Sequence, residues 1–137
     1  MQTFLPYDSF QRSAKVLDQR RLGKQRVEVL QLLKTLRDGG GYSNHPAARM
    51  WRGHEYDLAL YGVAVCQAWR RLGFKDTCLE KIELLGEDFP DDTSSPPWLG
   101  DECFHLSHRS NLVRKLPEHY RQFWPDVPDD MPYVWPA

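Results

Sequence analysis

Five charged residues in the longest helical pattern of the chain could do chemistry together: Arg20, Arg21, Lys24, Arg26 and Glu28. The four cations fall within two helical turns, and the glutamate follows Lys24 by one turn, so several cations can approach its carboxylate. Nearby positive charge lowers the pKa of a carboxylate and keeps it ionised. An ionised carboxylate can stabilise a cation that develops on a sugar, or it can orient an attacking amine. The alternative is a surface face with a weak Lys24–Glu28 ion pair.

Two more clusters contain residue types that position DNA through its phosphates. One lies near residue 110 and consists of His108, Arg109, Asn111, Arg114 and Lys115. The other lies near residue 50 and consists of His45, Arg49 and Arg52. His45 precedes a predicted helix and could titrate near neutral pH. The alternative for this cluster is a helix cap beside a packed aromatic residue.

The sequence disfavours a metal site. Glu102 and His105 form one Glu-x-x-His unit, whereas a carboxylate-bridged metal pair requires two. Cys66, Cys78 and Cys103 are widely spaced without a CxxC pair, which predicts buried, reduced thiols rather than disulfides or a zinc site. Phosphate-binding glycine loops and a nucleophile elbow are also missing from the sequence, which argues against nucleotide binding and a hydrolase triad. We expect no metal and no cofactor.

The formal net charge of −1 hides a division along the chain. Residues 1–75 hold 13 Lys and Arg against six Asp and Glu, whereas residues 76–137 hold five against 13. Phosphate binding depends on the local field over one face, so such a chain can bind nucleic acid; an acidic tail on an ordinary domain is the alternative. No apolar run reaches the roughly 20 residues of a membrane span, and no secretory signal begins the chain. We expect a cytoplasmic protein.

The apolar spacing that positions these residues is helical throughout. It predicts helices over residues 8–17, 18–38, 44–51, 54–72, 77–85 and 101–116, with a further turn up to residue 120. Residues 87–97 are acidic and proline-rich and predict a loop, and the four prolines of residues 124–137 exclude a regular helix there. The sequence therefore predicts an all-α single domain over residues 1–137. We expect a compact bundle of about three long helices plus short helices, with Trp98 packed in the core and an extended aromatic C-terminal tail.

With these residues placed, the chain resembles the pyrimidine dimer DNA glycosylases of the phage endonuclease V type, which are small all-α proteins. The likeness rests on the order, spacing and length of residues 18–28, 45–74 and 108–115 and of the aromatic C-terminus. The resemblance implies a monomer that acts without a metal or cofactor on double-stranded DNA with a damaged or modified base. It also implies that an N-terminal α-amine attacks the deoxyribose, displaces the base and then cuts the strand by β-elimination.

The resemblance assigns the catalytic carboxylate to Glu28 and phosphate contacts to the preceding arginines. The nucleophile of the family is a threonine exposed by removal of the initiator methionine, whereas here Gln2 separates Met1 from Thr3. The candidate nucleophiles are therefore the α-amine of Met1, that of Thr3 after trimming, or the side chain of Lys24. Two other functions stay open: a non-catalytic DNA- or RNA-binding module, and an interaction protein that docks through its Pro/Trp tail.

Overall fold

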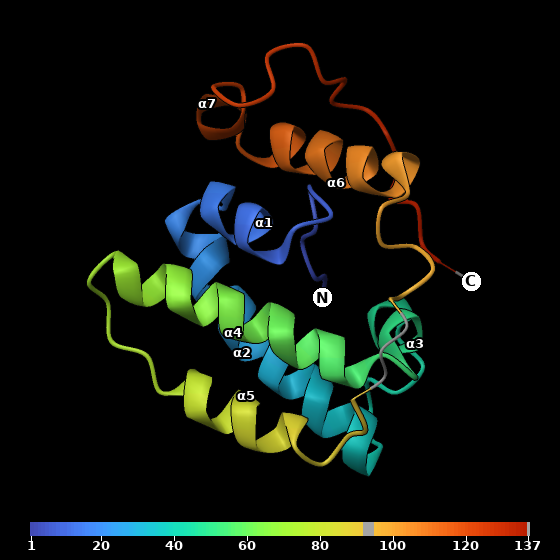
Figure 1. Ribbon diagram of the computed structural model, residues 1–137. Helices are drawn as coiled ribbons and strands as arrows, with labels where there is room; N and C mark the ends of the chain where they lie inside the picture. The colour runs from blue at the N-terminus through green and yellow to red at the C-terminus, as the bar shows by residue number, and fades with distance from the viewer. Residues whose placement is uncertain (92–94, 137) are drawn as a thin grey trace.

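Seven helices make up the described part of the computed structural model, residues 1–91 and 95–136, and no strand occurs there (Figure 1). They are α1 (Phe10–Val16), α2 (Gln19–Asp38), α3 (Pro46–Trp51), α4 (Glu55–Arg71), α5 (Cys78–Gly86), α6 (Glu102–Lys115) and α7 (Pro117–Tyr120). The predicted all-α class is confirmed, and α2, α4 and α6 are the three longest helices. Three residues of the predicted acidic loop, 92–94, lie outside the described residues.

The ends of the helices follow local capping chemistry. The Asp18 carboxylate accepts a hydrogen bond from the backbone N–H of Arg21 and starts α2, and Gly39, at φ 82°, ends it. His45 caps α3 because its Nδ1 accepts from the N–H of Ala47 at 3.0 Å. The helix cap proposed as an alternative for the residue-50 cluster is therefore present.

The helices form two groups with the N-terminal segment between them. α2, α4 and α5 pack together, and α1 lies against α4 (Figure 1). α6 and α7 lie on the opposite side of residues 1–7, and the C-terminal tail runs back along α6. The N–H of Val134 in the tail donates to the Ser107 hydroxyl of α6 at 3.1 Å. None of the described helices is both long enough and apolar enough to cross a bilayer.

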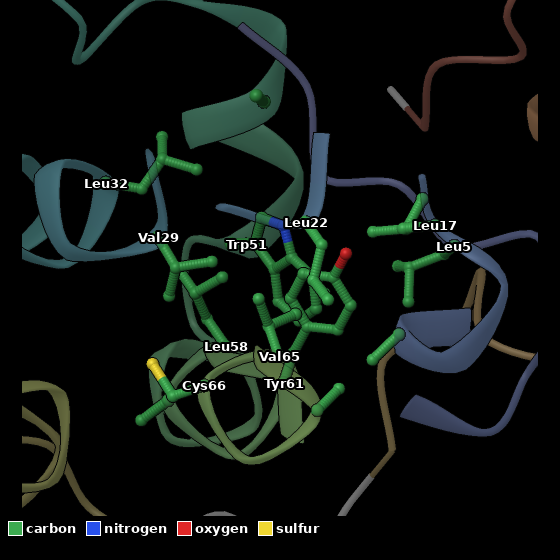
Figure 2. Packing of buried hydrophobic residues seen from close by; sticks show 14 of the residues in the cluster. Leu5, Leu17, Leu22, Val29, Leu32, Trp51, Leu58, Tyr61, Val65 and Cys66 are labelled. Carbon is green, nitrogen blue, oxygen red and sulfur yellow. The ribbon is translucent and has the colours of Figure 1, made fainter. Parts of the chain in front are cut away.

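Trp51 occupies the centre of the core (Figure 2). It is fully buried among α2 residues such as Leu22 and α4 residues such as Leu58, and its ring stacks on Tyr61 with centroids 6.3 Å apart. Trp98 meets it edge-on at 4.7 Å and is buried, which confirms the predicted packing of that residue. The core therefore anchors the end of α3 against the helices that carry the charged residues.

Cys66 and Cys78 are buried free thiols, as predicted, whereas Cys103 is exposed near the start of α6. Burial raises the pKa of the Cys66 thiol far above its usual range, so this cysteine stays protonated. The expectation of burial was wrong for Cys103 because its side of the first turn of α6 faces away from the core.

Candidate active site

Side chains from α6 and α3 hold the N-terminal segment. The Leu5 N–H donates to His108 Nδ1 at 3.0 Å, and the Leu5 carbonyl accepts from His105 Nδ1 at 2.8 Å. Trp51 Nε1 donates to the Thr3 hydroxyl at 3.0 Å. Extended backbone inside a protein needs such partners because it makes no helical hydrogen bonds of its own. These contacts fix the start of the chain against α6 and the end of α3.

Gln25 is the main contact between this segment and α2. Its Oε1 accepts from the Phe4 N–H at 2.7 Å and from the Tyr61 hydroxyl at 2.8 Å. Its Nε2 donates to the carbonyl of Gln2 at 2.8 Å. Although Gln25 is polar, its side chain is only 1% exposed and bonds to the buried backbone of the N-terminal segment.

Glu28 lies one turn beyond Gln25 and faces the start of the chain. Its Oε2 lies 3.4 Å from the backbone nitrogen of Gln2 and 3.4 Å from Gln25 Nε2. Its Oε1 lies 3.6 Å from Lys24 Nζ, so the i,i+4 ion pair anticipated from the sequence is present. The carboxylate is largely shielded, with the Glu28 side chain 13% exposed, whereas that of Lys24 is 75% exposed. The Glu28 carboxylate therefore lies between the exposed Lys24 ammonium and the first residues of the chain.

A cavity of about 680 Å³ opens beside these groups. It is lined by the N-terminal segment, α2, the end of α6 and the tail: Met1, Gln2, Phe4, Asp18, Arg20, Arg21, Lys24, Gln25, Glu28, Lys115, Leu116 and Tyr133. Four of these residues are cations and two are carboxylates. Burial, with the nearby charges of Arg21, Arg114 and Lys24, lowers the pKa of the Lys115 ammonium. The structure thus brings together Glu28, Met1 and four of the predicted phosphate-binding residues.

Asp18 links the cavity to α7. The Tyr120 hydroxyl donates to its carboxylate, and the Asp18 N–H donates to the same hydroxyl at 3.0 Å. Burial acts to raise the pKa of Asp18, but the hydrogen bonds from Tyr120 and Arg21 outweigh it, and the pKa is lowered. Asp18 therefore stays ionised and can hold Arg21, whose guanidinium lies 3.2 Å away.

Arg26 lies away from the cavity. Its Nη1 bonds to Asp76 Oδ1 at 2.6 Å, and its guanidinium stacks over Trp69 at 4.6 Å from the ring centroid. The Asp76 side chain is completely buried and also pairs with Arg70. This network joins α2 to the start of α5, and the phosphate contact of Arg26 stays a prediction.

Most side chains of the α6 cluster bond to other parts of the chain, although Arg114 and Lys115 are exposed. His108 and Asn111 are buried, and Asn111 donates to the Met131 carbonyl at 3.0 Å. Arg109 donates to the Pro6 carbonyl at 2.7 Å, and Arg114 to the Asp129 carbonyl at 3.0 Å. In this structure these four side chains hold the N-terminal segment and the tail, and their contact with DNA stays a prediction.

The α3 cluster lies beside the site but does not line the cavity. His45 makes an edge contact with Trp135, with ring centroids 6.1 Å apart. Burial, the positive charge of the chain's amine end and Arg49 lower the pKa of His45. Arg49 is exposed, and Arg52 donates to the Ser43 carbonyl at 2.8 Å. Their contact with DNA stays a prediction.

Thr3 is fully buried, and its N–H donates to Gln2 Oε1 at 2.9 Å rather than facing Glu28. Among the described backbone nitrogens, only that of Gln2 is hydrogen-bonded to the Glu28 carboxylate. Three important residues, Gln25, Tyr120 and Tyr133, were not predicted as site residues. The available signal was Gln25 at i,i+3 from Glu28, on the same side of α2.

The described residues contain no group of three or more His, Cys, Asp or Glu side chains arranged to hold a metal ion. The site is instead a carboxylate and the start of the chain in a cation-lined cavity of a small helical protein, an arrangement suited to an anionic substrate. The family model for pyrimidine dimer DNA glycosylase matches residues 1–81, and the chain therefore belongs to that family. Comparisons with curated proteins and with solved structures found no match.

Proposed function

We propose that this protein is a DNA glycosylase with AP-lyase activity that excises a damaged or modified base from double-stranded DNA. The observation that carries the proposal is the 3.4 Å contact between the Gln2 backbone nitrogen and Glu28 Oε2 inside the cation-lined cavity. Membership of the family supports a pyrimidine dimer as the lesion. We infer that the protein acts as a monomer.

The proposed reaction uses an α-amine at the start of the chain. An α-amine has a pKa of about 7.7–8.0, so a useful fraction is neutral and nucleophilic near neutral pH. Its nitrogen attacks C1′ of the damaged nucleotide, the N–C1′ bond forms and the glycosidic bond breaks, so the base leaves with its bonding electrons. In this proposal Glu28 accepts the proton that the amine loses and stabilises positive charge on the sugar.

The second half of the proposed reaction cuts the strand. Opening of the sugar ring gives an imine between the amine and C1′, and loss of a C2′ proton expels the 3′ phosphate by β-elimination. One water then hydrolyses the imine, which releases the sugar aldehyde and restores the amine. These steps require neither a metal nor a cofactor.

The start of the chain offers two amines for this role. If Met1 is retained, its amine lies one residue before the Gln2 nitrogen; if Met1 is removed, the Gln2 nitrogen itself becomes the amine beside Glu28. Exposure of Thr3 would delete Gln2, whose carbonyl and nitrogen contact Gln25 and Glu28. We therefore favour Met1 or Gln2, and mass spectrometry of the intact protein identifies which residue begins the mature chain.

The cations of the cavity fit the DNA backbone. Arg20, Arg21, Lys24 and Lys115 line it together, and phosphate contacts from such residues position a duplex. Within a duplex, C1′ of the deoxyribose is inaccessible to a nucleophile unless the nucleotide is distorted or extruded. The cavity can receive part of such an extruded nucleotide.

Borohydride trapping tests the proposal. Wild-type protein and a duplex with an abasic site should give a covalent adduct, mapped by peptide mass spectrometry to the first residue of the chain. Glu28→Gln keeps the size of the side chain but removes its charge, and should slow base excision from dimer-containing DNA by about 10²-fold or more. Full excision by Glu28→Gln would exclude the catalytic carboxylate, and an adduct on Lys24 would exclude the α-amine. Salt-dependent binding without any product would instead indicate the non-catalytic module.

A further inference from the structure

The chain fixes the orientation of the buried Gln25 amide. On one side the Phe4 N–H, a donor, requires the amide oxygen; on the other side the Gln2 carbonyl, an acceptor, requires the amide nitrogen. A reversed amide would oppose donor to donor and acceptor to acceptor. The Gln25 NH₂ group therefore points to the Gln2 carbonyl and to Glu28 Oε2 together.

Tyr61 supports this orientation from α4. Its buried hydroxyl lies 2.6 Å from the Phe4 carbonyl and 2.8 Å from Gln25 Oε1. A phenol has one proton, which these two acceptors share. Burial and the charge of Glu28 raise the pKa of Tyr61 well above its usual range, so the proton is retained. The amide is therefore held by two helices and by the segment that it positions.

We propose that Gln25 is the positioning residue of this active site, whose amide sets the separation between the nucleophilic start of the chain and the Glu28 carboxylate. The inference rests on the proposed function. One NH₂ group binds both the peptide carbonyl of the first residues and the carboxylate that works on them, so these two groups cannot drift apart independently. Gln25 itself does not contact the reacting atoms.

Gln25→Met tests the proposal because methionine has a similar length but neither donates to Gln2 nor accepts strongly from Phe4. Misplacement of reacting groups by about 1 Å can cost about 10²-fold in rate, so we expect a fall of that order in single-turnover excision. Affinity for a duplex with a stable abasic-site analogue should stay within about threefold of wild type, since the cations that bind phosphate are untouched. Ile82→Val, a buried change on α5 outside the site, is the control for lost packing and should keep the wild-type rate.

Gln25→Glu gives a second readout through pH. The charged or titratable groups that share this cavity are Asp18, Arg20, Arg21, Lys24 and Glu28 of α2 and its cap, Lys115, Tyr133 and the chain's amine end, with Tyr61 behind the amide. When ionised, the carboxylate introduced at position 25 repels Glu28 and the Gln2 carbonyl, whereas its protonated form can donate to either. The ratio of variant to wild-type rate should therefore rise as the pH is lowered.

The outcomes separate this inference from the proposed function. If wild type excises the base and Gln25→Met does so at the same rate, Gln25 has no positioning role but the glycosylase assignment stands. If wild type gives neither excision nor a trapped adduct, the proposed function itself fails. Should Gln25→Met not fold, Tyr61→Phe removes one support of the amide and should lower the rate in the same direction. A Gln25→Glu to wild-type ratio that does not change with pH would also overturn the inference.

Discussion

Polar side chains of this protein are buried where irregular backbone needs partners. The N-terminal segment has no helical hydrogen bonds, and its Leu5 peptide groups are satisfied by His105 and His108. A hydrophobic pattern treats glutamine and histidine as outward-facing, so it misplaces such residues. Each unpartnered buried peptide group costs about 1–3 kcal/mol, which makes these side chains structural requirements.

Because His108 is one of these partners, the stability of the fold should depend on pH. Burial, with a smaller effect of the His105 charge, lowers its pKa to about 3 from the usual 6.5. Between these values the unfolded chain binds a proton that the folded chain does not, so stability falls as the pH falls from 6.5 toward 3. The slope is at most about 1.4 kcal/mol per pH unit. Urea unfolding at several pH values between these limits measures it.

His108→Asn is the matched variant. Its amide oxygen can still accept from the Leu5 N–H, but the side chain does not titrate. We expect lower stability at neutral pH, because the smaller side chain packs less well, together with a flatter decline on acidification. Parallel stability curves for the two proteins would show that another group causes the decline.

At the scale of elements, capping and turn residues made the helices predictable. Asp18 and Gly39 bound α2 in sequence and in structure, and Pro46 lies in the first turn of α3 as its chemistry requires. The buried face of α6 was not predictable in the same way. Its covered residues include Ser107, Ser110 and Asn111, because the tail lies on them and forms its hydrogen bonds with them. The contact between the tail and α6 joins segments that are distant in the sequence, and helical periodicity contains no information about such contacts.

The close approach of α2, α4 and α5 depends on Gly62. A Cβ atom at this position would lie 2.6 Å from Val29 Cγ1 and 3.1 Å from the Ile82 side chain. Overpacking destabilises a protein by about 1–3 kcal/mol. The higher helix propensity of alanine offsets up to about 1 kcal/mol of this loss. Gly62→Ala should therefore lower the free energy of unfolding, by about 1–2 kcal/mol, measured from the urea midpoint at unchanged slope.

Gly41→Ala is the control for Gly62→Ala. Gly41 lies in the exposed turn after α2, and a Cβ atom there would have no neighbour within 4 Å. The free energy of unfolding of Gly41→Ala should stay within about 0.5 kcal/mol of the wild-type value. Equal stability of Gly62→Ala and wild type would mean that the helices separate at little cost.

At the scale of the molecule, the site spans more of the chain than the family match. The match ends at residue 81, yet Lys115, Leu116 and Tyr133 complete the cavity. The sequence places Glu28 and most of the cations correctly in one region, because they share α2. It does not separate Lys115, which reaches the cavity, from Arg109 and Arg114, which bind backbone carbonyls. That difference depends on where the N-terminal segment and tail cross α6.

Two cations at opposite ends of α2 have different electrostatic surroundings. Arg20 lines the cavity near the start of the helix, whereas Arg37 lies at the far end and pairs with Asp38 and Asp88. The intervening turns of helix separate them by about 25 Å, well beyond the screening length of about 8 Å at physiological salt. No carboxylate of the described residues forms an ion pair with Arg20, which can therefore act on phosphate, whereas the charge of Arg37 is neutralised by its two partners.

Salt dependence of DNA binding distinguishes these settings. Each phosphate contact adds about 0.9 to the slope of log affinity against log salt, so Arg20→Gln should lower the slope by about that amount. Arg37→Gln removes the same charge from the same helix and should leave the slope unchanged, since its partners are carboxylates. Titration of a labelled duplex at several salt concentrations measures both. An equal decrease of the slope in the two variants would mean that DNA binding responds to the net charge of the molecule. The cavity would then not be the DNA-binding face.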